Sequence, residues 1–416
     1  MSHGIEAEGE LEQICVDIFG PDIVARSPKL FEKKGYRELT DILVDCVDTL
    51  LIFQSKSVEM SAQELNEIKA GRLLKRLDTA KQQLATTLNA QRNGADVRYE
   101  NAVGIEMPVE WHNIKRKIGI VTLKISDAVY SDPLARYQLG HFVEDFRGIE
   151  VHYFLLSDLK QASLLLTTFK DFVSYLDTRK AAANQLDGFM SNELDLLILF
   201  KTRYDDLEEI LDGDDINKML IVEPGSWENS VSAATLREKI ESNMRESSPI
   251  DSIISMVFTT IEISVESGSC SRDQAILQYR IVVGLLSQLC RVSRRQIGRK
   301  LVEKRQNTLH KEDSYFVQIQ KDLDLAILFL VTNTPKGSGR MDRLGNFGAI
   351  AAKKVNQTHP VKNLLCIATE GRKQKGFSID YLFGQTVDFA DLVNGETEIK
   401  MFKDPELKQV DEWEQL

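Results

Sequence analysis

Apolar residues in the first part of the chain follow two different periods. Residues 6–19 repeat apolar side chains at spacings of three and four, which predicts a helix that ends at Gly20. Residues 38–46 and 49–56 are instead short, continuous apolar runs rich in Ile, Leu and Val. Such runs are typical of strands that are buried on both faces.

A long helix and further strands are predicted after this pair. A capping box begins at Ser61, and an apolar stripe at helical period continues until Gly94. Residues 117–125 and 149–156 read as two further strands, and residues 168–180 as a helix. The order of helix, strands, long helix and more strands predicts an α/β or α+β arrangement.

Three regions are expected along the chain. Residues 1–180 should form the first α/β domain, and residues 181–310 should be mainly helical, with a Ser/Glu-rich segment at 224–252 that we expect to be mobile in part. Residues 311–416 read as β-α-β-β, starting from a buried strand at 323–332, which predicts a small C-terminal α/β domain. The 416 residues contain no run of 18 apolar residues, so we expect no membrane span.

Composition narrows the class of protein. The five cysteines form no C-x-x-C pair and the six histidines are scattered, which argues against a zinc finger or ribbon. Reduced thiols and an N-terminus without an apolar signal core favour a cytoplasmic protein. The net charge of −11 does not suit a non-specific nucleic-acid binder, although a local basic groove would be enough for a nuclease.

Candidate chemistry lies at one end of the hairpin that the two apolar runs could form. Only Val47 and Asp48 separate the runs, which is short enough for a hairpin. If these residues form the loop, the residue numbers of each pair add up to 95, and Asp41 lies opposite Gln54. Lys56, two positions further, then points to the same face. A slip of one residue would change the partner, so the arrangement depends on this register.

A carboxylate, an amide oxygen and an ammonium on one face suit the cleavage of a phosphodiester. Mg²⁺ binds carboxylate and carbonyl oxygens, neutralises phosphoryl charge and activates water. Asp41 suits the ligand role, Gln54 offers a carbonyl oxygen, and Lys56 can orient the water or stabilise developing negative charge. Glu12 or Glu8, one turn apart on the first helix, could reach the sheet and complete the site.

These residues resemble a known pattern. Glu12, the segment Gly35-Tyr-Arg-Glu-Leu-Thr-Asp41 and the segment Phe53-Gln-Ser-Lys56 together resemble the PD-(D/E)xK superfamily of nucleases, and the Q-x-K form is similar to that of Mrr-type restriction endonucleases. The likeness covers about the first 180 residues, and the remainder resembles the C-terminal parts of uncharacterised bacterial proteins with such a core.

The resemblance implies a restriction-endonuclease-like mixed sheet flanked by helices. It also implies Mg²⁺ or Mn²⁺ binding at Asp41 and Gln54, a catalytic Lys56, a supporting Glu12, and nucleic acid as substrate, with DNA favoured over RNA. A role in host defence or DNA processing follows by analogy. Two positions depart from the pattern: Thr40 stands in place of Pro, and Gln54 in place of an acidic residue, which leaves one negative charge fewer for the metal.

Other interpretations of the same residues stay open. The site could be an inactive copy that binds nucleic acid without cutting it. It could also be a solvated strand end with a salt bridge between Asp41 and Lys56. A non-enzymatic interaction protein, which docks a partner through its acidic and basic helices, is the alternative from another functional class.

A basic helix is predicted at residues 291–305, with seven basic residues against one acidic residue. On such a helix five side chains could track phosphates: Arg291, Arg294, Arg295, Arg299 and Lys300. The same face could equally be solvated, or it could bind the acidic stretch at 205–215 of this chain or of a second subunit. The C-terminal region could therefore mediate a homo-oligomer or a partner-protein contact.

Overall fold

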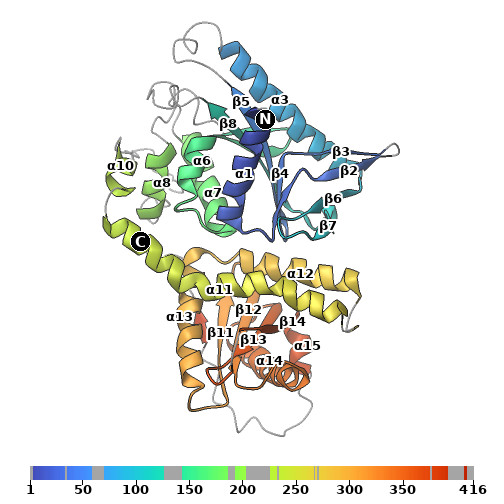
Figure 1. Cartoon of the computed structure of the whole chain (residues 1–416), viewed down its shortest axis with the longest axis vertical. Coiled ribbons are helices and arrows are strands. Elements are labelled where there is room, and N and C mark those ends of the chain that lie inside the picture. Colours follow the sequence, from blue (N-terminus) through green and yellow to red (C-terminus); the bar gives the residue numbers. More distant parts are fainter. Residues whose placement is uncertain are drawn as a thin grey trace. The chain divides into compact units, whose positions relative to one another are not determined.

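The protein is mixed α/β in its computed structural model (Figure 1). The structure describes residues 3–32, 35–58, 70–125, 143–185, 193–202, 225–231, 234–266, 268, 271–374, 377–391 and 407–409. The chain divides into two compact units. The first comprises Met1–Ile240 with Ser287–Cys290 and Gln415–Leu416, and the second comprises Glu241–Leu286 with Arg291–Glu414.

An antiparallel meander begins the first unit after helix α1, His3–Phe19. Strand β1, Val24–Arg26, pairs with β4, Ile42–Cys46, and β4 pairs with β5, Thr49–Val58. The expected helix and the two apolar strands are thus confirmed.

The register of this hairpin is also the expected one, from the pair Ile42 and Phe53 to the pair Cys46 and Thr49. Val47 in the loop has a φ of 54°, which is unfavourable for a β-branched residue. The buried sheet, rather than the turn residues, therefore sets the register.

Parallel strands extend this meander into a six-stranded sheet. Strand β8, Arg116–Ile125, lies parallel to β5, and β10, Ile149–Leu155, lies parallel to β8. Strand β9, Val143–Phe146, pairs antiparallel with β10, so that the order is β1-β4-β5-β8-β10-β9. Helix α3, Ala70–Arg92, is part of the crossover from β5 to β8, which parallel pairing requires. Its predicted start at Ser61 lies outside the described residues.

The two faces of this sheet are covered by different helices. The ring centroids of Phe19 on α1 and Phe53 on β5 are 6.1 Å apart, so α1 covers the face of Phe53. On the other face α3 packs so closely that a Cβ on Gly119 would lie 2.8 Å from Leu84 Cδ1. Gly119 pairs with Ile52, and side chains alternate along β5. Gln54 therefore shares the face of α3.

Smaller elements complete the first unit. A four-stranded antiparallel sheet in this unit has the order β3-β2-β6-β7. The remaining elements of this unit are β2 (Lys29–Glu32), β3 (Gly35–Glu38), β6 (Val97–Glu100), β7 (Glu106–Pro108), η1 (Trp111–Asn113), α6 (Leu156–Ala162), α7 (Phe169–Gln185), α8 (Glu193–Thr202) and α10 (Ser226–Val231).

The second unit contains a sheet of order β14-β13-β12-β11-β15. Its predicted β-α-β-β order is confirmed as β12-α14-β13-β14, while strand β11 was not expected. Helix α14 covers a core that includes Leu328, Leu344 and Cys366. The elements are β11 (Asp313–Gln320), β12 (Leu325–Thr332), α14 (Ser338–Thr358), β13 (Asn363–Glu370), β14 (Ile379–Gln385), α15 (Thr386–Asp391) and β15 (Leu407–Gln409).

Three helices precede this sheet: α11 (Ala234–Glu266), α12 (Arg272–Ser287) and α13 (Arg291–Asn307). The segment 224–252, which we expected to be mobile in part, is helical from Ala234 onward. Helix α11 persists there because Ile250, Ile253 and Val257 are fully buried. The acidic stretch at 205–215 lies outside the described residues.

Candidate functional site

The candidate site lies at the end of the β4–β5 hairpin that is remote from its loop. Strand β4 begins at Ile42, which pairs with Phe53, so Asp41 and Gln54 are the next two residues outward. The backbone N–H of Ser55 donates to Asp41 Oδ2 over 2.6 Å. The sheet backbone therefore holds the carboxylate at the end of β5.

Asp41 is ionised at a cost. Burial raises the pKa of its carboxyl from 3.8 to about 6. The bond from Ser55 and the charge of Lys56 act in the opposite direction, while the nearby charges of Glu8 and Glu38 add to the rise. A bound cation would relieve this penalty, because it would supply the positive charge that the carboxylate lacks.

Gln54 is buried, with 1% of its surface exposed. Its Nε2 donates to Thr40 Oγ1 over 2.8 Å, and Thr40 Oγ1 donates to the carbonyl oxygen of Phe53 over 2.7 Å. Gln54 Oε1 has no hydrogen-bond partner within the described part of the chain. A buried amide oxygen without a partner is unusual and costs free energy of about 1–3 kcal/mol.

Lys56 does not form the salt bridge that the solvated-strand interpretation expects. Its Nζ donates to the carbonyl oxygen of Ser55 over 3.0 Å, and among the described residues no ion pair joins it to Asp41. Burial lowers the pKa of the Lys56 ammonium. The charges of Asp41 and Glu8 oppose this change, and the charge of Arg76 adds to it. Lys56 and Asp41 are thus close enough for their charges to interact.

Of the two helix glutamates that could complete the site, Glu8 is the one whose charge affects Asp41 and Lys56. Glu12 Oε2 accepts a hydrogen bond from Arg26 Nη1 over 3.1 Å. Glu8 lies 3.7 Å from Arg26 Nη2, and its charge also acts on both Asp41 and Lys56. Glu12 therefore bonds to Arg26 of β1, whereas the negative charge of Glu8 acts on the charged groups of the site. Only their position one turn apart on α1 could have pointed to Glu8.

The donor set at this site suits a hard divalent cation that keeps part of its water shell. Asp41 and Gln54 offer oxygen ligands, as Mg²⁺ and Mn²⁺ prefer. The unpartnered Gln54 Oε1 is the atom that such an ion would coordinate, so the residues present fit the ion. No group of three His, Cys, Asp or Glu side chains that could hold a metal ion occurs in the described ranges. The cation would therefore keep several water ligands.

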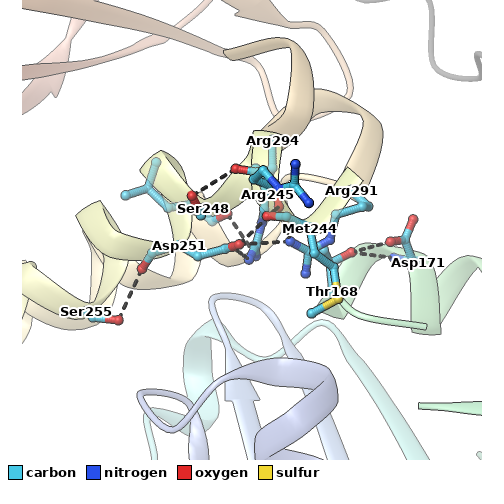
Figure 2. Close-up of polar contacts among 11 residues, drawn as sticks. Thr168, Asp171, Met244, Arg245, Ser248, Asp251, Ser255, Arg291 and Arg294 are labelled. Carbon is cyan, nitrogen blue, oxygen red and sulfur yellow. Dashed lines mark hydrogen bonds and ion pairs between the residues drawn. The ribbon is translucent and has the colours of Figure 1, made fainter. Parts of the chain in front are cut away.

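The predicted phosphate-binding face on α13 is engaged within its own unit. Figure 2 shows Asp251 of α11 between two arginines: its Oδ2 lies 2.8 Å from Arg291 Nη1, and its Oδ1 lies 2.8 Å from Arg294 Nη1. These arginines hold the pKa of Asp251 below its ordinary value, although burial acts to raise it. Arg294 is itself buried.

The other three predicted phosphate ligands also have partners on the same two helices. Arg295 donates to Asn243 over 2.7 Å, Arg299 lies 2.7 Å from Glu246, and Lys300 lies 3.2 Å from Glu303. The helices approach so closely that a Cβ on Gly298 would overlap the carbonyl group of Glu246. Much of the basic charge therefore joins α13 to α11, and a role in binding nucleic acid stays a prediction.

No single described helix is long and apolar enough to cross a bilayer. Among the described helices one pair, α12 with α13, passes by length and composition, and it is bent by 101°. Comparisons of the chain with protein-family models, with curated proteins and with solved structures find no match. The function is therefore inferred from the geometry around Asp41, Gln54 and Lys56.

Proposed function

We propose that the protein is a metal-dependent nuclease of the PD-(D/E)xK type that hydrolyses phosphodiester bonds, in DNA more than in RNA. The observation that carries the proposal is the buried Gln54 Oε1, which has no partner in the described residues. The β4–β5 register, continued by one residue, puts Gln54 opposite Asp41. The raised pKa of Asp41 and the nearby Lys56 support it. The helix, antiparallel strands, crossover helix and parallel strands suit a restriction-endonuclease-like fold.

Each of these residues then has a part in the proposed reaction. Asp41 and Gln54 would hold Mg²⁺ or Mn²⁺, an ion that neutralises phosphoryl charge and activates water when bound. Lys56 donates to a phosphoryl oxygen on which negative charge develops, or orients the attacking water. Glu8 adds negative charge that compensates in part for the amide at position 54, and Glu12 supports it by sharing Arg26.

The wider setting follows by analogy with the proposed superfamily. We expect a cytoplasmic enzyme that acts in host defence or DNA processing. The second unit, with its helix pair α11 and α13, would bind nucleic acid, a partner protein or a second copy of this chain. These expectations depend on the nuclease assignment.

Plasmid and single-stranded DNA, incubated with the full chain with and without Mn²⁺, test the proposal. We expect metal-dependent cutting that Lys56→Ala and Asp41→Ala each reduce by 100-fold or more, an order of magnitude typical of lost transition-state stabilisation. Lys180→Ala is the matched control, because Lys180 pairs with Glu150 at a distant strand, and it should cut normally. Cutting that survives both site variants would exclude this site.

One observation favours a second candidate function. Only one carboxylate, Asp41, is directly at the site, so the described residues hold less negative charge than a strong Mg²⁺ site needs. In this alternative the unit is an inactive nuclease-like scaffold that binds nucleic acid or protein. It predicts DNA binding without cutting at any Mn²⁺ concentration, and equal DNA affinity for wild type and Lys56→Ala.

A further inference from the structure

Thr40 and Gln54 are linked by a short chain of hydrogen bonds whose direction is fixed. The chain runs from Gln54 Nε2 to Thr40 Oγ1 and from Thr40 Oγ1 to the carbonyl oxygen of Phe53, over 2.8 and 2.7 Å. A carbonyl oxygen can only accept, so the single hydroxyl proton of Thr40 is committed to Phe53. The Thr40 oxygen can then only accept from Gln54.

This direction decides which end of the Gln54 amide is free. The nitrogen must face Thr40, which leaves Oε1 as the end without a partner in the described residues. Both side chains are 1% exposed, so solvent does not compete readily for either group. If the amide were reversed, Oε1 would face a hydroxyl oxygen that has no second proton, and Nε2 would occupy the position of the metal ligand.

We infer that Thr40 is a positioning residue that turns the carbonyl oxygen of Gln54 toward a bound divalent cation. This inference rests on the proposed function, and it links the two departures from the PD-(D/E)xK pattern. A carboxylate at position 54 has two equivalent oxygens and needs no such orientation. An amide does, and the hydroxyl at position 40 supplies it. The threonine at position 40 and the amide at position 54 therefore depend on each other. They are not two independent losses of metal-binding capacity.

Titration of the full chain with Mn²⁺ tests the inference. Thr40→Val should weaken Mn²⁺ binding by about 10-fold, as expected for an outer-shell residue that orients a ligand, and Thr40→Ser should restore most of the affinity. Thr87→Val is the matched control: Thr87 is also a fully buried threonine that donates to a backbone carbonyl oxygen, that of Leu39, but among the described residues no hydrogen bond joins it to Gln54. It should leave Mn²⁺ affinity unchanged.

A second background separates orientation from a general structural role. In Gln54→Glu chains, Thr40→Val should change Mn²⁺ affinity by less than about 2-fold, because a carboxylate needs no orientation. Equal losses in the Gln54 and Gln54→Glu backgrounds would overturn the inference, since a purely structural role of Thr40 predicts the same loss in both.

A measurement without metal keeps this result distinct from the proposed function. In full chain labelled with ¹⁵N-glutamine, the side-chain signal of Gln54 is identified by its loss in Gln54→Leu. We expect the proton that donates to Thr40 to move upfield in Thr40→Val and to stay in place in Thr40→Ser. An unmoved proton contradicts the inference. Absence of Mn²⁺ binding by the wild type instead contradicts the proposed function.

Discussion

Each of the two compact units has a group of charged side chains near the ends of sheet strands, buried in the second unit and half-buried in the first, and the two groups differ in how their charges are compensated. In the second unit the guanidinium of Arg340, at the start of α14, is fully buried. It donates to Asp380, to Glu370 over 2.9 Å and to Ser378 Oγ over 2.9 Å. The pKa of Glu370 is lowered although burial acts to raise it, because Ser378 and Arg340 stabilise its charge.

In the first unit the effect of burial on the pKa values is larger than the opposing effect of the neighbouring charges. Burial raises the pKa of Asp41 and lowers that of Lys56, and Gln54 Oε1 has no partner in the described residues. Buried charges are tolerated in a fold when opposite charges compensate them, whereas uncompensated ones persist where the chemistry uses them. The comparison therefore separates a structural cluster around Arg340 from a candidate active site around Asp41.

The largest expected effect comes from breaking the compensated cluster. Arg340→Met leaves Glu370 and Asp380 buried without their cation, and should lower the local stability of the second unit by about 3–5 kcal/mol. Hydrogen exchange of β12 and β13, followed by mass spectrometry, measures this loss.

Lys56→Met is the matched substitution in the first unit. It removes a half-buried cation that forms no ion pair with a carboxylate among the described residues, so the stability of β5 should change by no more than about 1 kcal/mol. Similar losses from the two variants would contradict the distinction between the clusters.

The next largest effect is expected when the charge of Asp41 is removed, which should give a gain in stability that depends on pH. The folded pKa of Asp41, about 6, lies above its ordinary value of 3.8, so its contribution to stability is full below this ordinary value and is lost as pH rises through about 6. Asp41→Asn keeps an oxygen for Ser55. In metal-free protein it should raise the free energy of unfolding by about 2 kcal/mol at pH 8 and by little at pH 4.

Glu370→Gln is the counterpart of this variant, because the pKa of Glu370 is shifted in the opposite direction from that of Asp41. The lowered pKa of Glu370 means that its contribution is present above the ordinary value and is lost as pH falls through the folded value. The substitution should therefore destabilise the second unit at pH 8 and have less effect in acid. Hydrogen exchange of β5 and β13 at both pH values measures the stability of the two units separately. If Asp41→Asn and Glu370→Gln changed stability in the same direction at pH 8, the comparison would be contradicted.

Much of the N-terminal site could be predicted from the sequence because its geometry is local. The two adjacent apolar runs allow a single register in which both are buried with a two-residue loop, and alternation along β5 places Gln54 and Lys56 on one face. The choice between Glu8 and Glu12 was not accessible, because both lie at the edge of the apolar stripe of α1. It depends on where Arg26 of β1 meets the helix.

Features that depend on distant partners could not be predicted. Arg340 meets Glu370 and Asp380, which are 30 and 40 residues further along the chain. The hydroxyl of Thr40 acquires its role only when β5 supplies both a donor and an acceptor. The first half of α11 was not singled out within the helical region because it is Ser/Glu-rich and contains Pro249, although the residues that follow pack in the core.

The smallest effect on stability is expected on α13, where Arg299 pairs with Glu246 at the surface. The Arg299 side chain is 54% exposed, so Arg299→Ala should change stability by less than about 0.5 kcal/mol. If Arg299 contacts a phosphate as predicted, the logarithmic slope of DNA affinity against salt should fall by about one in this variant. An unchanged slope would remove Arg299 from the predicted phosphate-binding set.

Mn²⁺ titration of the full chain by calorimetry tests the central claim most directly. The account predicts saturable binding to the wild type, a loss of about 10-fold or more in affinity for Asp41→Asn and for Gln54→Leu, and unchanged affinity for Glu370→Gln, whose carboxylate is already compensated. No saturable binding to the wild type, or the same affinity in Asp41→Asn as in the wild type, would contradict it.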